Sequence, residues 1–303
     1  MSGFFDLQVN GYGGVDFNRD ALNAQELHRA CERLQNDGVS GILATIISDE
    51  LGVMARRLAN LAQLRESDPL ARQIIAGIHI EGPFLNENPG YRGAHPADAM
   101  RPADIDEMQR LLDNAQGLTK LVTLAPERDA NFQVTRLLHE VGIVVSAGHC
   151  DPTLDEIQGA IDNGLSMWTH LGNGCPMLLP RHDNVVMRAL SLSERLWLCF
   201  IADGAHVPFF ALKNYLRAAG LERCVIVTDA IAPASLGPGR YTLGRWELEI
   251  GPDMVARAPD GSHLVGAAIT MAQSAAHLRR HLGLSGAEIE QLTSLNPRRA
   301  LGF

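Results

Sequence analysis

Eight short apolar segments recur along this chain of 303 residues, and stretches with helical spacing lie between most of them. Strands that alternate with helices imply a parallel sheet, and nearly continuous apolar strands fit burial on both faces. Eight such units within about 250 residues is the size of a TIM-type (β/α)8 barrel. An open doubly wound sheet is the competing architecture, but no G-x-G-x-x-G follows the first strand, so we favour the barrel. The predicted strands cover residues 4–11, 38–47, 74–82, 119–126, 142–149, 165–173, 196–204 and 223–230.

The helical stretches between these segments have recognisable ends and apolar faces. The stretch "DPTLDE" places Thr153 as an N-cap with Glu156 three residues later, which is a capping-box pattern. Residues 23–38 end in a glycine, a common helix stop. We expect this helix to bury one face made of Leu27, Ala30, Cys31 and Leu34.

Two stretches interrupt the alternation of strands and helices. Residues 86–102 read as a long loop after the third strand. Residues 241–266 alternate in polarity and contain Pro-Asp-Gly, which predicts a β-hairpin excursion after the eighth strand. No internal repeat or interdomain linker is visible, so we expect a single barrel domain over residues 1–303 with this excursion.

Charge and composition exclude several classes of partner. The net charge of −9 argues against nucleic acid or an anionic membrane surface as the main partner. No apolar run is long enough to span a bilayer, and too few residues precede the first apolar segment for a signal peptide. The five cysteines form no C-x-x-C pair and are odd in number, so we expect reduced thiols in a cytoplasmic protein.

Acidic and imidazole side chains stand at the ends of the apolar strands, where an unpaired charge is costly to bury. Because parallel strands of a barrel open onto one face at their C-terminal ends, these groups should converge there. One carboxylate and two imidazoles suit zinc and leave a position for water, and the cation would balance the buried charge. The third, fifth, sixth and eighth strands end in Glu81, His149, His170 and Asp229, and His206 follows the seventh.

Each of these side chains has an expected role. Asp229 should accept a proton from water and later pass it to a leaving group, while His206 should polarise a substrate carbonyl. His79 shares a strand face with Glu81 and should orient the ligands from behind. Asp203 reads either as a residue that supports a side chain of the site or as a structural one. Taken singly, a histidine at a strand end is also explained as a hydrogen-bonded structural residue, and Asp229 as a turn cap.

Taken together, these segments resemble the amidohydrolase superfamily, and within it the N-acetylglucosamine-6-phosphate deacetylase family. The matching stretches occur in the family's order over almost the whole chain. They are "DLQVNGYGGVDFN", "GIHIEGPFLN", "KLVTLAPE", "IVVSAGHCDPT", "THLGN", "IADGAHV", "VTDAIAPA" and "TSLNPRRALGF".

The resemblance implies a (β/α)8 barrel in which Glu81, His149 and His170 hold a divalent metal ion and Asp229 is the general base and acid. Superfamily members often carry H-x-H on the first strand, where this chain has Gln8 and Asn10. Amides replace imidazole poorly as zinc ligands. A deacetylase subgroup with this Q-x-N form uses a single metal, so we expect one ion per subunit, Zn²⁺ or else Fe²⁺. Gln8 and Asn10 are then expected near water or substrate.

The resemblance also implies substrate contacts. His95 should touch sugar hydroxyls, and His206 should polarise the acetyl carbonyl. Asn173 and Gly174 lie in the stretch that binds the sugar. Arg181 stands where the family has a phosphate-binding arginine, often reaching a neighbouring subunit, and an Arg fork suits phosphate oxygens.

Two departures from the family pattern bear on these expectations. "HLGNGCPMLLPRHDN" differs from the usual loop, so the sugar or phosphate end of the pocket is expected to be reshaped. The chain also begins almost at the first strand and stops at "NPRRALGF", so most or all of the usual β-sandwich is expected to be missing, with a homodimer covering exposed barrel surface.

The predicted reaction is hydrolysis of an N-acetylated amino-sugar phosphate, most plausibly N-acetylglucosamine 6-phosphate, to the amine and acetate. One alternative is an amidohydrolase that acts on another acylated amine, a cyclic amide or a lactone. A second is a non-catalytic sugar-phosphate-binding protein, which would have no need for Asp229 together with three ligand residues.

Overall fold

The computed structural model describes residues 3–244, 246–252, 254–258 and 264–303, and its centre is an eight-stranded parallel sheet. The strands follow one another around the sheet in chain order, and neighbouring strands in this order run parallel. They are β1 (Phe4–Val9), β4 (Val39–Ile47), β5 (Ile75–Glu81), β6 (Thr119–Leu124), β7 (Val144–Ala147), β8 (Leu165–Trp168), β9 (Trp197–Ile201) and β10 (Cys224–Val227).

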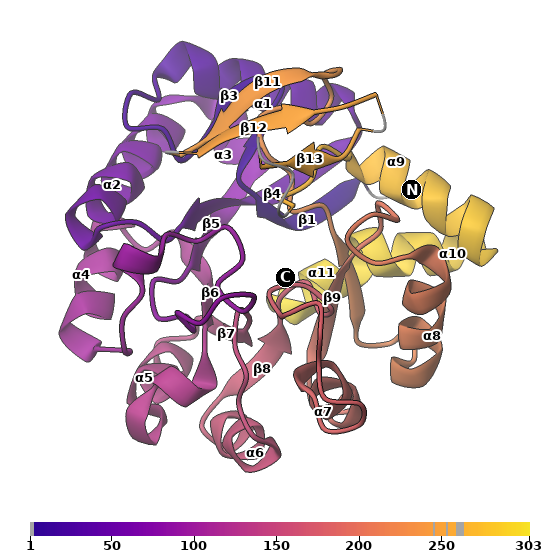
Figure 1. Ribbon diagram of the computed structural model, residues 1–303. Helices are drawn as coiled ribbons and strands as arrows, with labels where there is room; N and C mark the ends of the chain where they lie inside the picture. The colour runs from indigo at the N-terminus through magenta and orange to yellow at the C-terminus, as the bar shows by residue number, and fades with distance from the viewer. Residues whose placement is uncertain (1–2, 245, 253, 259–263) are drawn as a thin grey trace.

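The sheet curls until its last strand returns to its first, as the ring of arrows in Figure 1 shows. The two ends meet at a parallel bridge between Val9 and Ala230, and the backbone N–H of Asn10 donates to the carbonyl of Ala230 at 2.7 Å. The predicted parallel eight-stranded barrel is therefore confirmed as a nearly closed one. The expected loss of the β-sandwich stays a prediction.

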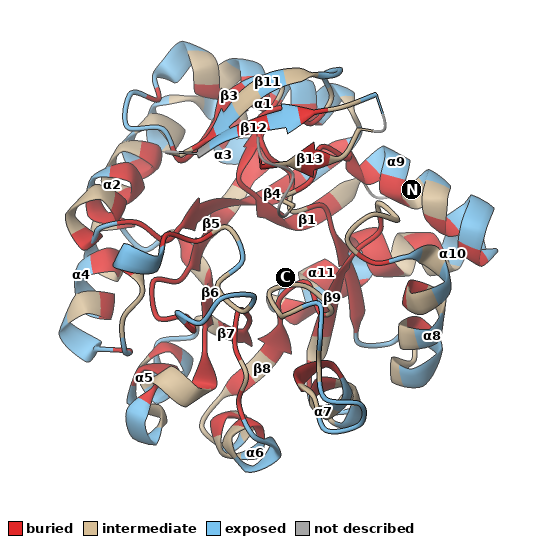
Figure 2. Cartoon of the chain, viewed as in Figure 1, coloured by how far each residue is buried: buried red, intermediate tan, exposed pale blue. Residues whose placement is uncertain are grey.

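Helices surround the sheet, with buried faces turned inward and exposed faces outward (Figure 2). The predicted apolar face of α1 is confirmed, as is the capping box at Thr153. The α-helices are α1 (Ala24–Asn36), α2 (Leu51–Ser67), α3 (Pro69–Ile74), α4 (Ile105–Asn114), α5 (Gln133–Glu140), α6 (Leu154–Asp162), α7 (Val185–Ser191), α8 (Phe209–Ala219), α9 (Met271–His277), α10 (Gly286–Glu290) and α11 (Asn296–Ala300). Short 3-10 or π turns are η1 (Ala97–Ala99), η2 (Pro126–Arg128), η3 (Ala130–Phe132), η4 (Leu278–Leu282) and η5 (Gln291–Leu295). No helix within the described residues is long and apolar enough to cross a membrane.

A small antiparallel sheet follows β10, in the region where the sequence predicts an excursion. It consists of β11 (Gly239–Leu243), β12 (Trp246–Ile250) and β13 (Ala256–Arg257), so it starts two residues before the predicted segment. Residues 245, 253 and 259–263 of the prediction lie outside the described residues. Its apolar side chains pack in one cluster with Ile47 at the end of β4 and with Ala94. The sheet therefore covers part of the C-terminal end of the barrel.

A second, very short hairpin connects β1 to α1. It pairs β2 (Gly11–Tyr12) with β3 (Val15–Asp16). The carboxylate of Asp16 accepts the backbone N–H of Gly244 at 2.6 Å, which fastens the small sheet to this hairpin.

A buried aspartate links the first and last strands at the barrel seam. Asp6 on β1 lies 2.6 Å from Thr228 Oγ1, and it also accepts the backbone N–H groups of Gln8 and Thr228. Burial raises the pKa of Asp6 to about 7, although these hydrogen bonds oppose the shift. The folded state therefore retains a proton that the unfolded chain releases at its ordinary value near 3.8.

This raised pKa makes stability depend on pH. Since the folded state binds the extra proton, stability falls as pH rises from about 4 to about 7. Asp6→Asn mimics the protonated acid and lacks this pH dependence. The free energy of unfolding of the variant minus that of the natural chain should therefore increase over that window and then level off. Urea unfolding near pH 5, 6 and 8 measures this difference. A difference that does not change with pH would contradict the assignment.

Candidate metal centre and active site

Four of the predicted site residues lie at or just beyond the C-terminal ends of their strands. Glu81 is the last residue of β5, and the other three each follow a strand by two residues. These three have left-handed backbones, with φ of 52° at His149, 30° at His170 and 53° at Asp229. Non-glycine residues adopt this region only at an energetic cost, and residues in such conformations cluster at functional sites. The backbone thus supports a functional reading of the three positions.

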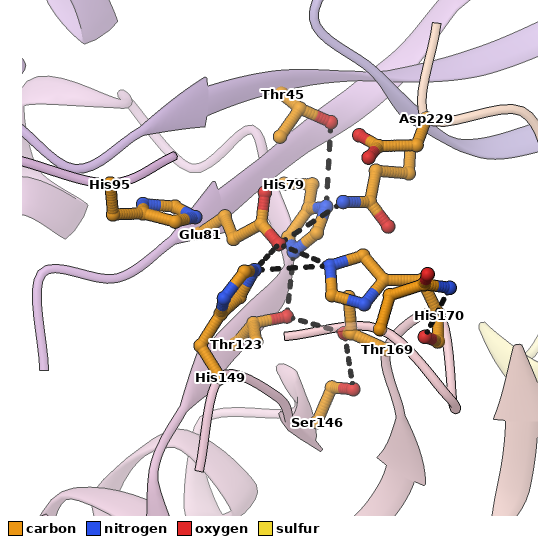
Figure 3. A network of polar contacts seen from close by, with 12 residues as sticks. Thr45, His79, Glu81, His95, Thr123, Ser146, His149, Thr169, His170 and Asp229 are labelled. Atoms are coloured by element: carbon orange, nitrogen blue, oxygen red, sulfur yellow. Dashed lines mark hydrogen bonds and ion pairs between the residues drawn. The ribbon is translucent and has the colours of Figure 1, made fainter. Parts of the chain in front are cut away.

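Three side chains from different strands meet at one point (Figure 3). His170 Nε2 lies 3.1 Å from Glu81 Oε1, His149 Nε2 lies 3.4 Å from the same oxygen, and the two nitrogens are 3.1 Å apart. All three residues are buried. The structure therefore brings together Glu81, His149 and His170, as the sequence predicts.

Hydrogen bonds of His149 fix which nitrogen faces this point. Its Nδ1 lies 2.8 Å from the carbonyl oxygen of Tyr91, which can only accept, so Nδ1 carries the hydrogen. A neutral ring then presents a bare lone pair at Nε2, as a metal ligand must.

Two glycines fit against the ring of His149. A Cβ atom added to Gly174 would lie 2.8 Å from His149 Nδ1, and one added to Gly93 would lie 3.0 Å from His149 Cε1. Both glycines also have positive φ. Only glycine suits these two positions, and together they hold the imidazole ring in place.

The electrostatics of the three side chains favour a shared positive charge. Burial alone raises the pKa of Glu81 and lowers that of His170. The hydrogen bond and the charge interaction between these two side chains outweigh the effect of burial. As a result the pKa of Glu81 lies well below its usual value and that of His170 above. Positive charge beside Glu81 therefore balances its buried carboxylate, and a bound cation would serve the same purpose.

The spacing of the three donors fits a metal ion. Ligands at about 2.0–2.1 Å from a tetrahedral Zn²⁺ are about 3.3 Å from one another. The observed separations of 3.1, 3.1 and 3.4 Å match this edge length. The donor set is thus of the right kind and spacing for a divalent ion with one open position.

His95 belongs to a second grouping around the same carboxylate. Ligand atoms of Glu81, His95 and His149 all lie within 4.8 Å of one another, so this set also qualifies as a candidate metal site among the described residues. The ring of His95 packs edge-on against that of His149, with 4.4 Å between the ring centroids. Nδ1 of His95 contacts Ser48 Oγ at 2.8 Å. Burial, and then the charge of His149, lower the pKa of His95 to about 3, so the ring is neutral. The sequence predicts His95 as a sugar contact, and the structure places it beside the donors.

Asp229 is poised to exchange protons near neutral pH. Burial first, and then the negative charge of Glu81, raise the pKa of Asp229 to about 6, while His170, His206 and a hydrogen bond from Asn10 oppose the shift. A carboxylate with a pKa in this range can both accept and return a proton. This agrees with the predicted role of general base and acid.

His206 is held by the carboxylate of Asp203, which the sequence leaves open as a supporting or a structural residue. Asp203 Oδ2 lies 2.7 Å from His206 Nδ1, and Oδ1 accepts the backbone N–H groups of Ala205 and His206. Asp203 therefore fixes both the loop and the ring. The D-x-x-H spacing is the signal that could have identified this pair.

His79 lies below the site and contacts none of the three donors directly. Its Nε2 is 2.8 Å from Thr123 Oγ1, which continues at 2.7 Å to Thr169 and from there at 2.7 Å to Ser146 (Figure 3). Thr45 contacts the other ring nitrogen at 3.4 Å. The ring of His79 is engaged by hydroxyl groups of the barrel interior, one of which belongs to a chain of contacts that includes Thr169, next to His170, so the expectation that His79 orients the ligands from behind stays a prediction.

The side-chain amides of Gln8 and Asn10 donate hydrogen bonds to carboxylates of the protein. Gln8 donates to Glu81 Oε1 at 3.1 Å, and Asn10 donates to Asp229 Oδ1 at 2.7 Å. Sequence reasoning placed both near water or substrate and gave no sign of these partners, because they are 73 and 219 residues away along the chain.

The loop between β8 and α7 carries the remaining predicted substrate residues. Asn173 turns its amide back to the carbonyl of His170 at 3.1 Å, so it caps the turn that carries this histidine. Arg181 is exposed on the same loop, and a place for it in a phosphate site stays a prediction. Two apolar side chains near it, Met177 and Leu178, are 99% and 92% exposed.

A further carboxylate braces the loops around the site, and the sequence analysis missed it. Glu127 Oε1 accepts the side-chain amide of Asn86 at 2.9 Å and the backbone N–H of Asp151 at 2.6 Å. Asn86 in turn donates its backbone N–H to the carbonyl of His149. Glu127 stands at the end of "TLAPE", shortly after a strand, as the other acidic residues of the site do. This position is the signal by which the sequence could have identified it.

Comparison with known proteins identifies relatives of this chain, although no protein-family model matches it. It is 31% identical over 306 residues to the N-acetylglucosamine-6-phosphate deacetylase of Bacillus subtilis (strain 168), covering 100% of this chain and 75% of that protein. It is 32% identical over 302 residues to the N-acetylgalactosamine-6-phosphate deacetylase of Escherichia coli O157:H7, covering 99% and 77%. The chain thus spans about three quarters of the length of these relatives.

Solved structures agree with these relatives. An aspartate-to-alanine variant of the N-acetyl-D-glucosamine-6-phosphate deacetylase from Mycobacterium smegmatis, in complex with N-acetyl-D-glucosamine 6-phosphate, matches with a TM-score of 0.90 and 30% identity. The match covers 100% of this chain and 77% of that one. The N-acetylglucosamine-6-phosphate deacetylase from Thermotoga maritima matches with a TM-score of 0.87 and 28% identity, covering 100% and 78%.

Proposed function

Because the chain belongs to the N-acetylglucosamine-6-phosphate deacetylase family of the amidohydrolase superfamily, we propose that it removes the acetyl group from N-acetylglucosamine 6-phosphate. The products are glucosamine 6-phosphate and acetate. The observation that carries this proposal is the convergence of Glu81, His149 and His170 beside Asp229 at the open end of the barrel.

A divalent metal ion would be held by Glu81, His149 and His170, whose donor atoms lie 3.1–3.4 Å from one another. When bound, it supplies Lewis-acid chemistry, which makes water more acidic and a carbonyl carbon more electrophilic. One divalent ion per chain is proposed, and Zn²⁺ suits the nitrogen and oxygen donors, with Fe²⁺ as the alternative.

Asp229 moves the proton in both halves of the reaction. It accepts a proton from the attacking water as the water oxygen bonds to the acetyl carbon. It then returns this proton to the nitrogen as the C–N bond breaks, so the amine and acetate leave in balance. His206 donates to the negative charge that develops on the acetyl oxygen, and the Asp203 carboxylate at its Nδ1 holds the ring for that task.

His95 and Arg181 supply the proposed contacts at the sugar and phosphate. Asn173 and Gly174, which the sequence also placed there, form the turn beside His149 and His170. The 4-epimer, N-acetylgalactosamine 6-phosphate, is a second candidate substrate because a curated relative of equal similarity is named for it.

Assembly, domain organisation and location are also proposed. The chain forms one catalytic barrel domain over residues 1–303 and associates as a homodimer, for which the exposed Met177 and Leu178 offer apolar surface. All five cysteines are free thiols and four are buried, which fits a cytoplasmic location.

Acetate release from a panel of sugars tests the proposed function. The zinc-loaded protein should release acetate from the 6-phosphates of N-acetylglucosamine or N-acetylgalactosamine, and at least about 10-fold more slowly from unphosphorylated N-acetylglucosamine. The ratio of kcat/KM for the two epimers decides the sugar. Absence of acetate from every phosphorylated sugar, or equal rates with and without phosphate, would reject the proposal.

Exchange of single histidines tests which side chains hold the ion. His170→Asn should lose the bound zinc, because it removes one of three donors. His95→Asn should keep about one zinc per chain, because His95 is assigned to the substrate. Elemental analysis of the purified, dialysed proteins measures both. The reverse pattern would favour the set of Glu81, His95 and His149.

Removing the base separates chemistry from metal binding. Asp229→Asn should keep the metal and lose turnover by a factor of about 10²–10⁴, since the amide cannot accept the proton. Asp106→Asn, at an exposed position on α4, is the matched control and should retain full activity. Turnover close to that of the natural chain in the Asp229 variant would remove the assigned base.

A further inference from the structure

The two amide side chains of β1 reach the two carboxylates of the site. Gln8 lies on β1 and Asn10 is the first residue after it, so with one residue between them they point to the same side of the extended chain. Gln8 Nε2 donates to Glu81 Oε1 at 3.1 Å and Asn10 Nδ2 donates to Asp229 Oδ1 at 2.7 Å. Both amides are only 2% exposed. One strand thus supplies a hydrogen bond to the proposed metal ligand and another to the proposed base.

The chemistry of the partners fixes the orientation of both amides. An ionised carboxylate only accepts hydrogen bonds, so the amide nitrogen and not its oxygen must face it. Such donors stabilise a carboxylate without adding charge to the site. This matters because Glu81 and Asp229 repel one another, and the charge of Glu81 contributes to the raised pKa of Asp229.

The position of β1 in the barrel makes this double contact possible. The strand lies between β4 and β10, the seam at which the barrel closes. At the seam the backbone N–H of Asn10 donates to the carbonyl of Ala230, the residue after Asp229. Thr45 Oγ1 on the other neighbouring strand accepts the backbone N–H of Val9 at 3.1 Å. The two amides are therefore carried by backbone that is fixed on both sides.

We propose that Gln8 and Asn10 are positioning residues, Gln8 for the metal ligand Glu81 and Asn10 for the base Asp229, and that neither serves primarily to bind substrate. The assignment of ligand and base rests on the proposed function. Gln8 holds one oxygen of Glu81 and thereby orients the carboxylate toward the two imidazoles. Asn10 holds one oxygen of Asp229 and leaves the other oxygen free to exchange a proton.

Near-isosteric variants without donors test the two roles separately. Gln8→Met should weaken Zn²⁺ binding by about 10–100-fold, the usual effect of removing a hydrogen-bond partner of a ligand. Asn10→Leu should leave Zn²⁺ affinity within about twofold and lower kcat by about 10–100-fold with KM unchanged. Competition with a chromophoric chelator measures the affinity, and thermal unfolding shows that both variants fold. Each variant is the control for the other.

A crystal structure of the zinc-loaded Asn10→Leu protein gives a readout that does not depend on activity. The Asp229 carboxylate should turn away from its position in the natural chain. If the natural chain releases no acetate, the proposed function fails while the chelator and crystal measurements still decide the positioning roles. A rise in KM with kcat unchanged in either variant, or unchanged Zn²⁺ affinity in Gln8→Met, would overturn the inference.

Discussion

Burial of the Glu81 carboxylate is the constraint on which the site depends. A buried carboxylate is stable only with a positive partner and satisfied hydrogen bonds. Here the carboxylate has imidazole nitrogens at 3.1 and 3.4 Å and an amide donor at 3.1 Å. The same arrangement that satisfies the charge also gives three donors with the spacing of a metal site. The need to pair one buried charge and the capacity to hold an ion are therefore one property of the molecule.

The backbone around this centre is strained where the chemistry lies and well supported elsewhere. Residues His149, His170 and Asp229 have left-handed conformations, and each follows a strand of the barrel by two residues. The barrel and its interior hydroxyl groups hold these turns in place. The chain of contacts through Thr123, Thr169 and Ser146 continues the polar layer beneath the ligands. A rigid sheet thus fixes residues whose own backbones are unfavourable.

The loops at the open end of the barrel are fitted to one another around His149. Gly93 and Gly174 come from different loops and both contact its ring. Glu127 joins two further segments through Asn86 and Asp151. The small sheet adds its apolar face beside Ala94, one residue before His95. The surroundings of His149 are therefore assembled from segments that follow β5, β6, β7, β8 and β10.

The sequence by itself determined the parallel barrel, the buried face of α1 and the strand-end residues Glu81, His149, His170 and Asp229. Periodicity and strand direction are local properties, and a parallel barrel brings all C-terminal strand ends to one face. Only the tertiary structure decided the partners of Gln8 and Asn10, the Asp203–His206 pair and the place of His95 beside the donors. Except for the Asp203–His206 pair, which lies within one loop, these contacts join side chains from separate elements, and their distances depend on barrel closure and loop packing. The spacing of the strands along the sequence constrains neither barrel closure nor loop packing.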